Sequence, residues 1–115
     1  MPTLTQGPRA YEAAATHRSL RVQEADVFRR ATGALRAARD SDAILRAQAI
    51  ADNRRLWLTV NDLMRDPLNP LPQELRASIV GVGLAVQREM DGPKPDFDFL
   101  IGINENIAAG LTAGN

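Results

Sequence analysis

The sequence contains no cysteine, and this absence excludes several kinds of site at once. Disulfide frameworks, thiolate nucleophiles and cysteine-ligated zinc all need a thiol, so the chain is compatible with a reducing compartment. Histidine is almost as scarce. The only one, His17, is followed by Ser19 at a spacing that does not bring a hydroxyl nucleophile onto an imidazole base. We predict that the protein is not an enzyme.

Aromatic residues and net charge are also low. Aromatics make up 4% of the 115 residues, and 14 basic residues balance 14 acidic ones. A neutral chain lacks the bulk attraction that draws proteins to nucleic acid or anionic membranes. The charges are nevertheless unevenly distributed, with a basic excess up to residue 65 and an acidic excess after it. Two interpretations stay open: the two halves attract each other within the fold, or a partner docks on the basic half.

Long hydrophobic runs are missing too. The longest uncharged apolar stretch runs from Ala77 to Val86, about half of the roughly 20 residues that span a bilayer. The first residues, 1–6, lack the charged start and apolar run of a signal peptide. We therefore expect a cytoplasmic protein without a membrane segment. Domains cluster at about 100–150 residues, so residues 1–115 are predicted to form one domain with frayed ends at 1–8 and 112–115.

Sites for metals and cofactors are not expected. The segment 91–98 is rich in Asp but lacks the alternating oxygen ligands and closing Glu of a calcium loop. Gly81-Val82-Gly83 has neither the preceding strand nor the further residues of a phosphate-binding loop. The sequence predicts no metal and no cofactor.

Helical periodicity is present almost everywhere instead. Apolar residues recur at three- and four-residue steps, and Gly and Pro clusters separate the periodic segments. Ser41 is predicted to cap the third helix, Pro72 to occupy the first position of the fourth, and Asp96 to cap the last. The predicted fold is a single compact all-α bundle of about five helices: residues 9–17, 19–39, 42–65, a helix from 72 that ends before Gly92, and a last helix from 96.

The fourth predicted helix is apolar on all sides between Ile79 and Val86, which predicts a central helix packed on more than one face. Gly81 and Gly83 each lower helix propensity by about 1 kcal/mol relative to Ala, so we expect a neighbouring helix to approach closely at both. A buried strand over residues 79–86 is the alternative, since the segment is rich in β-branched residues.

The most informative block joins Asn53-Arg54-Arg55-Leu56-Trp57 to the proline-rich stretch that follows it. Trp57 fits a core position, because Ile50 and Met64 share its helical spacing. It also fits a binding surface, because Trp and Arg are frequent at interface hot spots and small helical modules often hold a partner helix in a groove. A third possibility is RNA binding, with paired Arg residues along a phosphate track and Trp57 as a stacking platform. Direct RNA contact is the least favoured of the three, given the neutral charge.

Several motifs taken together resemble the FlaF family of flagellar biosynthesis regulators of alphaproteobacteria. The motifs are Ala10-Tyr11, Asn53-Arg54-Arg55-Leu56-Trp57, Asp66-Pro67-Leu68-Asn69-Pro70-Leu71-Pro72 with Leu75-Arg76, and the run from Ile103-Asn104 to Ala109-Gly110-Leu111. They follow one another in the family's order over residues 10–111.

The resemblance implies a cytoplasmic protein needed for flagellin synthesis and export, with flagellin as partner and a functional link to the flagellin-mRNA regulator FlbT. A helical chaperone would cover the apolar faces of flagellin's terminal segments, which form helices but are unstructured before assembly. The alternative is an RNA-associated regulator of flagellin mRNA. The resemblance implies no catalytic residue. Within the matched region we select Arg54, Trp57 and Met64 as partner-binding candidates.

The remaining motif residues are interpreted as structural. We expect Asn53, Asn69 and Asn104 to cap helix ends and connector carbonyls with their side-chain amides. The structural set consists of Asn53, Leu56, Asn69, Pro70, Leu71, Pro72, Gly81, Gly83 and Asn104.

Overall fold

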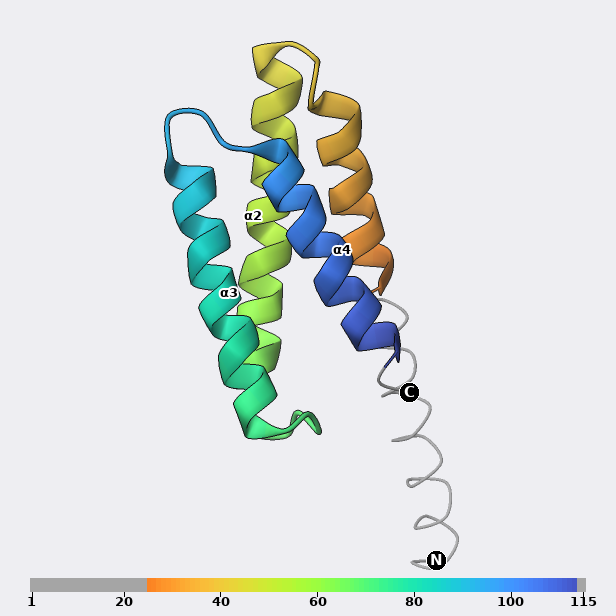
Figure 1. Ribbon diagram of the computed structural model, residues 1–115, viewed down its shortest axis with the longest axis vertical. Coiled ribbons are helices and arrows are strands. Elements are labelled where there is room, and N and C mark those ends of the chain that lie inside the picture. Colours follow the sequence, from red (N-terminus) through yellow and green to blue (C-terminus); the bar gives the residue numbers. More distant parts are fainter. Residues whose placement is uncertain (1–24, 114–115) are drawn as a thin grey trace, which may run out of the picture.

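The computed structural model of the protein describes residues 25–113, and within this range the chain forms helices and no strand. Residues 25–38 are helical, α2 spans Ala43–Arg65, α3 spans Gln73–Asp91 and α4 spans Phe97–Ala113. Successive helices run in opposite directions, and α4 crosses the others obliquely (Figure 1). The predicted all-α bundle is confirmed, and the strand alternative for residues 79–86 is wrong.

Some of the predicted boundaries cannot be compared with the structure, and others differ from it. The helix predicted over residues 9–17, together with His17 and Ser19, lies outside the described residues. At the other end, α4 continues to Ala113, which is inside the segment predicted to fray.

The helix starts follow from local hydrogen bonds. Asp42, rather than the predicted Ser41, caps α2, because its carboxylate accepts from the backbone N–H of Leu45 at 2.9 Å. Pro72 stands one position before α3, with extended backbone angles and no side-chain cap. Asp96 caps α4 as predicted, accepting from the backbone N–H of Phe99 at 3.1 Å.

Side chains hold the connector between α2 and α3 in place. The Asn69 amide donates to the Leu63 carbonyl at 2.8 Å and accepts from the Leu71 N–H at 3.0 Å. The Arg76 guanidinium donates to three backbone carbonyls, at 3.1 to 3.3 Å, which belong to the end of α2 and to the connector. Unpaired carbonyls at a helix end need such donors, so this network fixes how the chain turns from α2 into α3.

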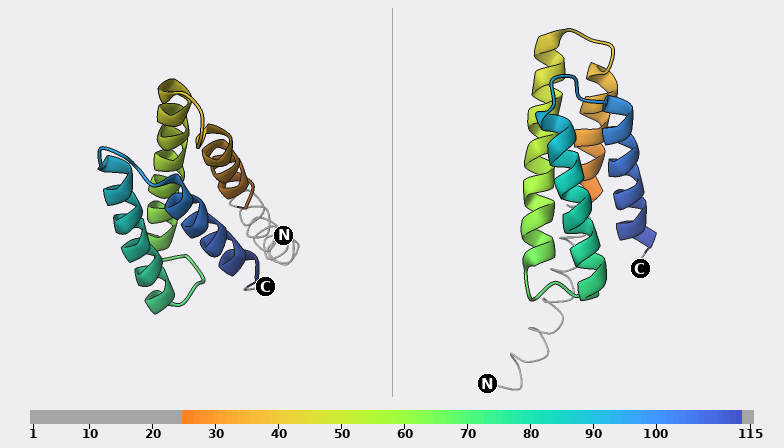
Figure 2. Two further views of the ribbon diagram at one scale, coloured as in Figure 1. Left: turned by 45° about the horizontal axis from the view of Figure 1, so that its top comes forward. Right: turned by 60° about the vertical axis from the view of Figure 1, so that its left-hand side comes forward.

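α2 buries more side chains than α3, the helix after Pro72 that was predicted to be central. Six side chains of α2 are buried: Ala49, Asn53, Leu56, Trp57, Val60 and Met64. α3 buries only Ile79, Val86 and Met90. α3 has more apolar residues than it buries in the core: Leu84 is 60% exposed and Val80 is only half-buried. α3 nevertheless contacts both α2 and α4, so its predicted packing on more than one face is confirmed, although part of its surface stays exposed (Figure 2).

Candidate functional site

A chain of hydrogen bonds between buried side chains links three helices through the core. The indole N–H of Trp57 donates to Asn104 Oδ1 at 2.9 Å, and Asn104 Nδ2 donates to Asn53 Oδ1 at 2.7 Å. Asn53 Nδ2 in turn contacts the Met90 sulfur at 3.4 Å. Both Asn side chains are fully buried. The chain joins α2, α3 and α4 by directional bonds, which apolar packing does not provide.

This geometry corrects the capping role expected for Asn53 and Asn104. Neither amide lies at a helix end, and each finds its partner on another helix instead. No buried side-chain nitrogen or oxygen of the described residues lacks a hydrogen bond. An unpaired buried polar group costs about 1–3 kcal/mol. The core can therefore contain two Asn residues only because their side chains are hydrogen-bonded.

Two of the three partner-binding candidates also lie in the core. Trp57 is 3% exposed and packs edge-on against Phe28, with ring centroids 6.2 Å apart, and Met64 is 4% exposed. In this conformation neither side chain is accessible to a partner or to a nucleic-acid base, so contact through them stays a prediction. Arg54 reaches the surface, where it forms an ion pair with Asp91 of α3 at 2.7 Å.

The other residues of the structural set also differ in their surroundings. Leu56 is buried, Leu71 is half-buried and Pro70 is exposed. A Cβ at Gly83 would lie 3.2 Å from the Trp57 ring, as the predicted close approach requires. At Gly81 nothing lies within 4 Å, so the close approach expected there is not observed.

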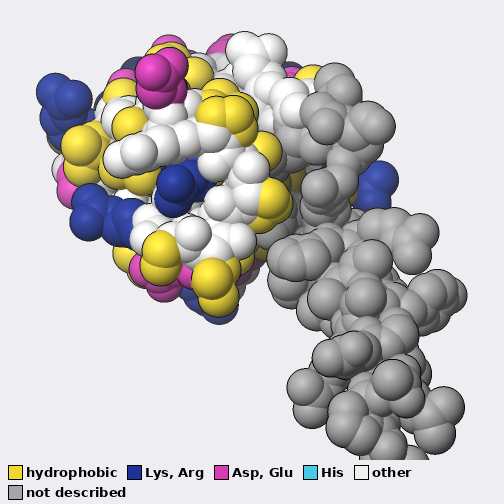
Figure 3. All heavy atoms as spheres, turned by 90° about the horizontal axis from the view of Figure 1, so that it is seen from below, with side chains coloured by type: hydrophobic (Ala, Val, Ile, Leu, Met, Phe, Trp, Pro, Cys, Tyr) yellow, Lys and Arg dark blue, Asp and Glu magenta, His cyan; other side chains and the backbone are white. Residues whose placement is uncertain are grey.

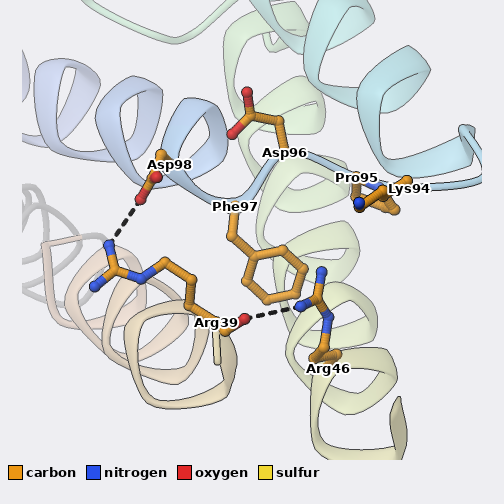
Figure 4. Close-up of a pocket in the computed structure, with 7 residues that line it drawn as sticks. All are labelled: Arg39, Arg46, Lys94, Pro95, Asp96, Phe97 and Asp98. Atoms are coloured by element: carbon orange, nitrogen blue, oxygen red, sulfur yellow. Dashed lines mark hydrogen bonds and ion pairs between the residues drawn. The ribbon is translucent and has the colours of Figure 1, made fainter. Parts of the chain in front are cut away.

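A hollow of about 360 Å³ lies beside the start of α4 and contains both charged and aromatic groups (Figure 4). Arg46 stacks on the Phe97 ring at 4.6 Å and donates to the Arg39 carbonyl at 2.8 Å. A hydrogen bond to the Asp98 carboxylate, with the negative charges of Asp98 and Asp40, raises the pKa of the Arg39 guanidinium. Two cations of the hollow are thus engaged within the protein. We interpret this region as the junction that holds α4 to α2 and the 25–38 helix.

The solvent side of α2 and α3 carries a set of apolar residues that the core does not use. Ile44 is 70% exposed, Leu58 57% and Leu84 60%. Ile44, Ala51 and Leu58 are seven residues apart and share one face of α2. Since Trp57 contacts Gly83 across the interface of these antiparallel helices, the next residues, Leu58 and Leu84, point to the same side at about the same height. With Ala47 and Val80 they form a surface that we call the outer face.

Sequence reasoning missed the outer face, although the seven-residue spacing beside the core stripe was a signal for it. Arg54 forms its ion pair with Asp91 between the two helices that carry this face, so only this one of the selected candidates adjoins it. The bonds of Asn104 to Asn53 and Trp57 place α4 on the core side of α2, opposite the outer face.

The connector end of the bundle is a second exposed apolar region. Leu68 is 83% exposed and Leu75 is 45% exposed. Viewed from this end, hydrophobic side chains reach the surface at several places (Figure 3). The hydrogen bonds of Asn69 and Arg76 hold the backbone beneath them, so Leu68 projects from a fixed loop.

Two further searches concern the described residues alone. Among residues 25–113, no group of His, Asp or Glu side chains is arranged to hold a metal ion. In the same part of the chain, no helix is both long enough and apolar enough to cross a bilayer.

A family model described as flagellar protein FlaF matches residues 8–111. Comparisons with curated proteins and with solved structures give no significant match.

Proposed function

Because the chain belongs to the FlaF family of flagellar proteins, we propose that it binds flagellin before export and keeps it soluble. The docked part of flagellin is a terminal segment that folds into an amphipathic helix on the outer face. Since the bound fraction of the protein then depends on the amount of unexported flagellin, binding also couples flagellin production to export. A functional link to FlbT belongs to the same proposal.

The observation that supports the proposal best is the exposure of Ile44, Leu58 and Leu84 on one surface. Large apolar side chains gathered on a soluble domain mark an interaction site. Two antiparallel helices with such residues along their edges offer a groove in which an amphipathic helix buries its apolar side. The spacing of Ile44, Ala51 and Leu58 suits a partner helix whose apolar residues repeat every seven positions.

The test is co-expression with flagellin followed by size-exclusion chromatography at about 0.5 M salt, where phosphate contacts weaken steeply but apolar contacts persist. We expect one peak that contains both proteins. The double variant Leu58→Glu, Leu84→Glu should lose flagellin, because both side chains are more than half exposed and their replacement leaves the core intact.

Leu45→Glu is the matched control. Leu45 is also on α2 and is 47% exposed, but its position on the helix turns it away from the outer face. This variant should retain flagellin. If both variants lose flagellin, or if both retain it, the assignment to the outer face is refuted. A salt-sensitive complex with flagellin leader RNA, and none with flagellin, would refute the proposed function itself.

A further inference from the structure

We propose that, in the absence of flagellin, the outer face binds a second copy of the chain, with α2 antiparallel to α2 of the other copy. The starting observation is the charge pattern around Leu58. Arg55 lies three residues before it and Asp62 four residues after it, so both share its side of α2. The outer face thus carries opposite charges about one helical turn before and one turn after an exposed leucine.

The charges on the two sides of Leu58 match those of a second copy only when the two α2 helices run antiparallel. When α2 of one copy lies antiparallel to α2 of the other with Leu58 at the centre, each Arg55 meets the other copy's Asp62. A parallel arrangement would bring like charges together instead. Among the described residues Asp62 has no ion pair, and the ion pair of Arg55 is an exposed one to Asp52 at 3.4 Å on its own helix.

The same arrangement covers the remaining exposed apolar residues. Ile44 precedes Leu58 by four turns, or about 21 Å at 1.5 Å per residue. In an antiparallel pair it therefore reaches the connector of the other copy, where Leu68 is 83% exposed. Leu58 and Leu84 lie near the centre and face their own counterparts. One contact thus buries the four most exposed large hydrophobic side chains among the described residues.

The size of the face indicates which class of interface the contact belongs to. A helix of 23 residues, as α2 is, measures about 35 Å, and two neighbouring helices are about 18 Å wide. The face then offers roughly 600 Å² per copy, or about 1,200 Å² in total, at the lower limit of specific interfaces. We therefore expect a weak, reversible dimer that is populated at high protein concentration.

A weak dimer on this face has a regulatory consequence, and this consequence alone rests on the proposed function. Flagellin and the second copy compete for the same apolar residues, so each molecule of flagellin that binds removes one copy from the dimer. The outer face is covered when flagellin is scarce. Because flagellin binding also dissociates the dimer, the fraction of the protein that is bound to flagellin rises more steeply with flagellin concentration.

The experiment is sedimentation velocity on the purified full chain between about 1 and 300 μM, a range that covers micromolar dissociation constants. We expect the mass to rise from monomer to dimer. Arg55→Glu and Asp62→Arg should each lower the dimer fraction several-fold, because each brings like charges together. The double variant Arg55→Glu, Asp62→Arg should restore the dimer. These side chains are exposed, and circular dichroism checks that the fold is retained.

Each outcome bears on a distinct claim. A monomer at every concentration overturns the dimer while the flagellin proposal stands. A dimer that the double variant does not restore overturns the antiparallel arrangement. Titration with flagellin should convert the dimer into a one-to-one complex, and a ternary complex on an intact dimer would overturn the shared face.

Discussion

Replacement of Asn104 by Ala tests the buried hydrogen-bond chain. The amide accepts from the Trp57 indole at 2.9 Å and donates to Asn53 at 2.7 Å. Its removal leaves one donor and one acceptor buried without a partner, at about 1–3 kcal/mol each. The lost volume adds about 1 kcal/mol for the cavity. We expect the free energy of unfolding to fall by about 3–7 kcal/mol, a large part of the roughly 5–15 kcal/mol that holds a domain together.

Urea unfolding followed by circular dichroism and by the fluorescence of the single Trp measures this loss. Asn106→Ala is the matched control, because Asn106 is exposed on the same helix, and its replacement should cost less than about 0.5 kcal/mol. A loss below about 1 kcal/mol for Asn104→Ala, less than the cost of one unpaired buried group, would refute the reasoning.

A second comparison separates hydrogen bonding from packing. Asn104→Leu fills the space but still leaves the Trp57 and Asn53 groups unpaired, so it should remain destabilised. The triple variant Asn53→Leu, Trp57→Phe, Asn104→Leu removes all the partners together and should recover most of the stability, since matched apolar groups replace buried polar ones at little cost. Failure to recover would assign the loss to packing instead.

The remaining predictions concern the helix contacts and are measured by thermal or urea unfolding. Gly81→Ala should stabilise the protein by about 1 kcal/mol through helix propensity, because a Cβ there meets nothing within 4 Å. Gly83→Ala should destabilise it by about 1 kcal/mol, because the indole 3.2 Å away is buried and hydrogen-bonded; equal effects at the two glycines would contradict this geometry. Arg76→Ala should cost about 1–2 kcal/mol by removing the donor to the Leu71, Met64 and Asp66 carbonyls, of which only the Asp66 carbonyl keeps a second donor within the described part of the chain, the Asn69 N–H, whereas the exposed Arg88→Ala should be near neutral. Arg54→Ala should cost less than about 1 kcal/mol, and the cost should shrink further in high salt, because its ion pair is exposed.

Local periodicity was sufficient to predict most of the helices. The third helix was predicted over residues 42–65 and observed at Ala43–Arg65, because its apolar steps and the following Asp66-Pro67 are both local signals. The choice of Asp42 over Ser41 as cap was not predictable from residue preference, since both are good caps. The position of the cap depends on where the preceding turn ends. The Ser41 N–H donates to the Ala38 carbonyl, so Ser41 still belongs to that turn and Asp42 is the residue that precedes α2.

The site depends on contacts that sequence patterns do not encode. Asn53 and Asn104 are 51 positions apart, and an isolated Asn in a helix looks like a capping or surface residue until its partner is known. The two glycines stand in similar apolar surroundings in the sequence, yet only Gly83 meets the indole. Which apolar residues of α3 are buried was not predictable, because composition does not distinguish a buried apolar residue from an exposed one such as Leu84.

The buried polar chain and the exposed apolar face depend on each other. Trp57 is oriented by its bond to Asn104, and the ring so placed contacts Gly83. This contact sets the height of α3 against α2. Leu58 and Leu84 directly follow the two contacting residues, so their alignment on the outer face derives from the same contact. Apolar residues in place of the two Asn would pack as well but would permit other orientations of the indole and other registers of α3. The polar core is therefore best understood as the feature that positions the outer face for binding, because directional bonds define a register that dispersion forces leave open.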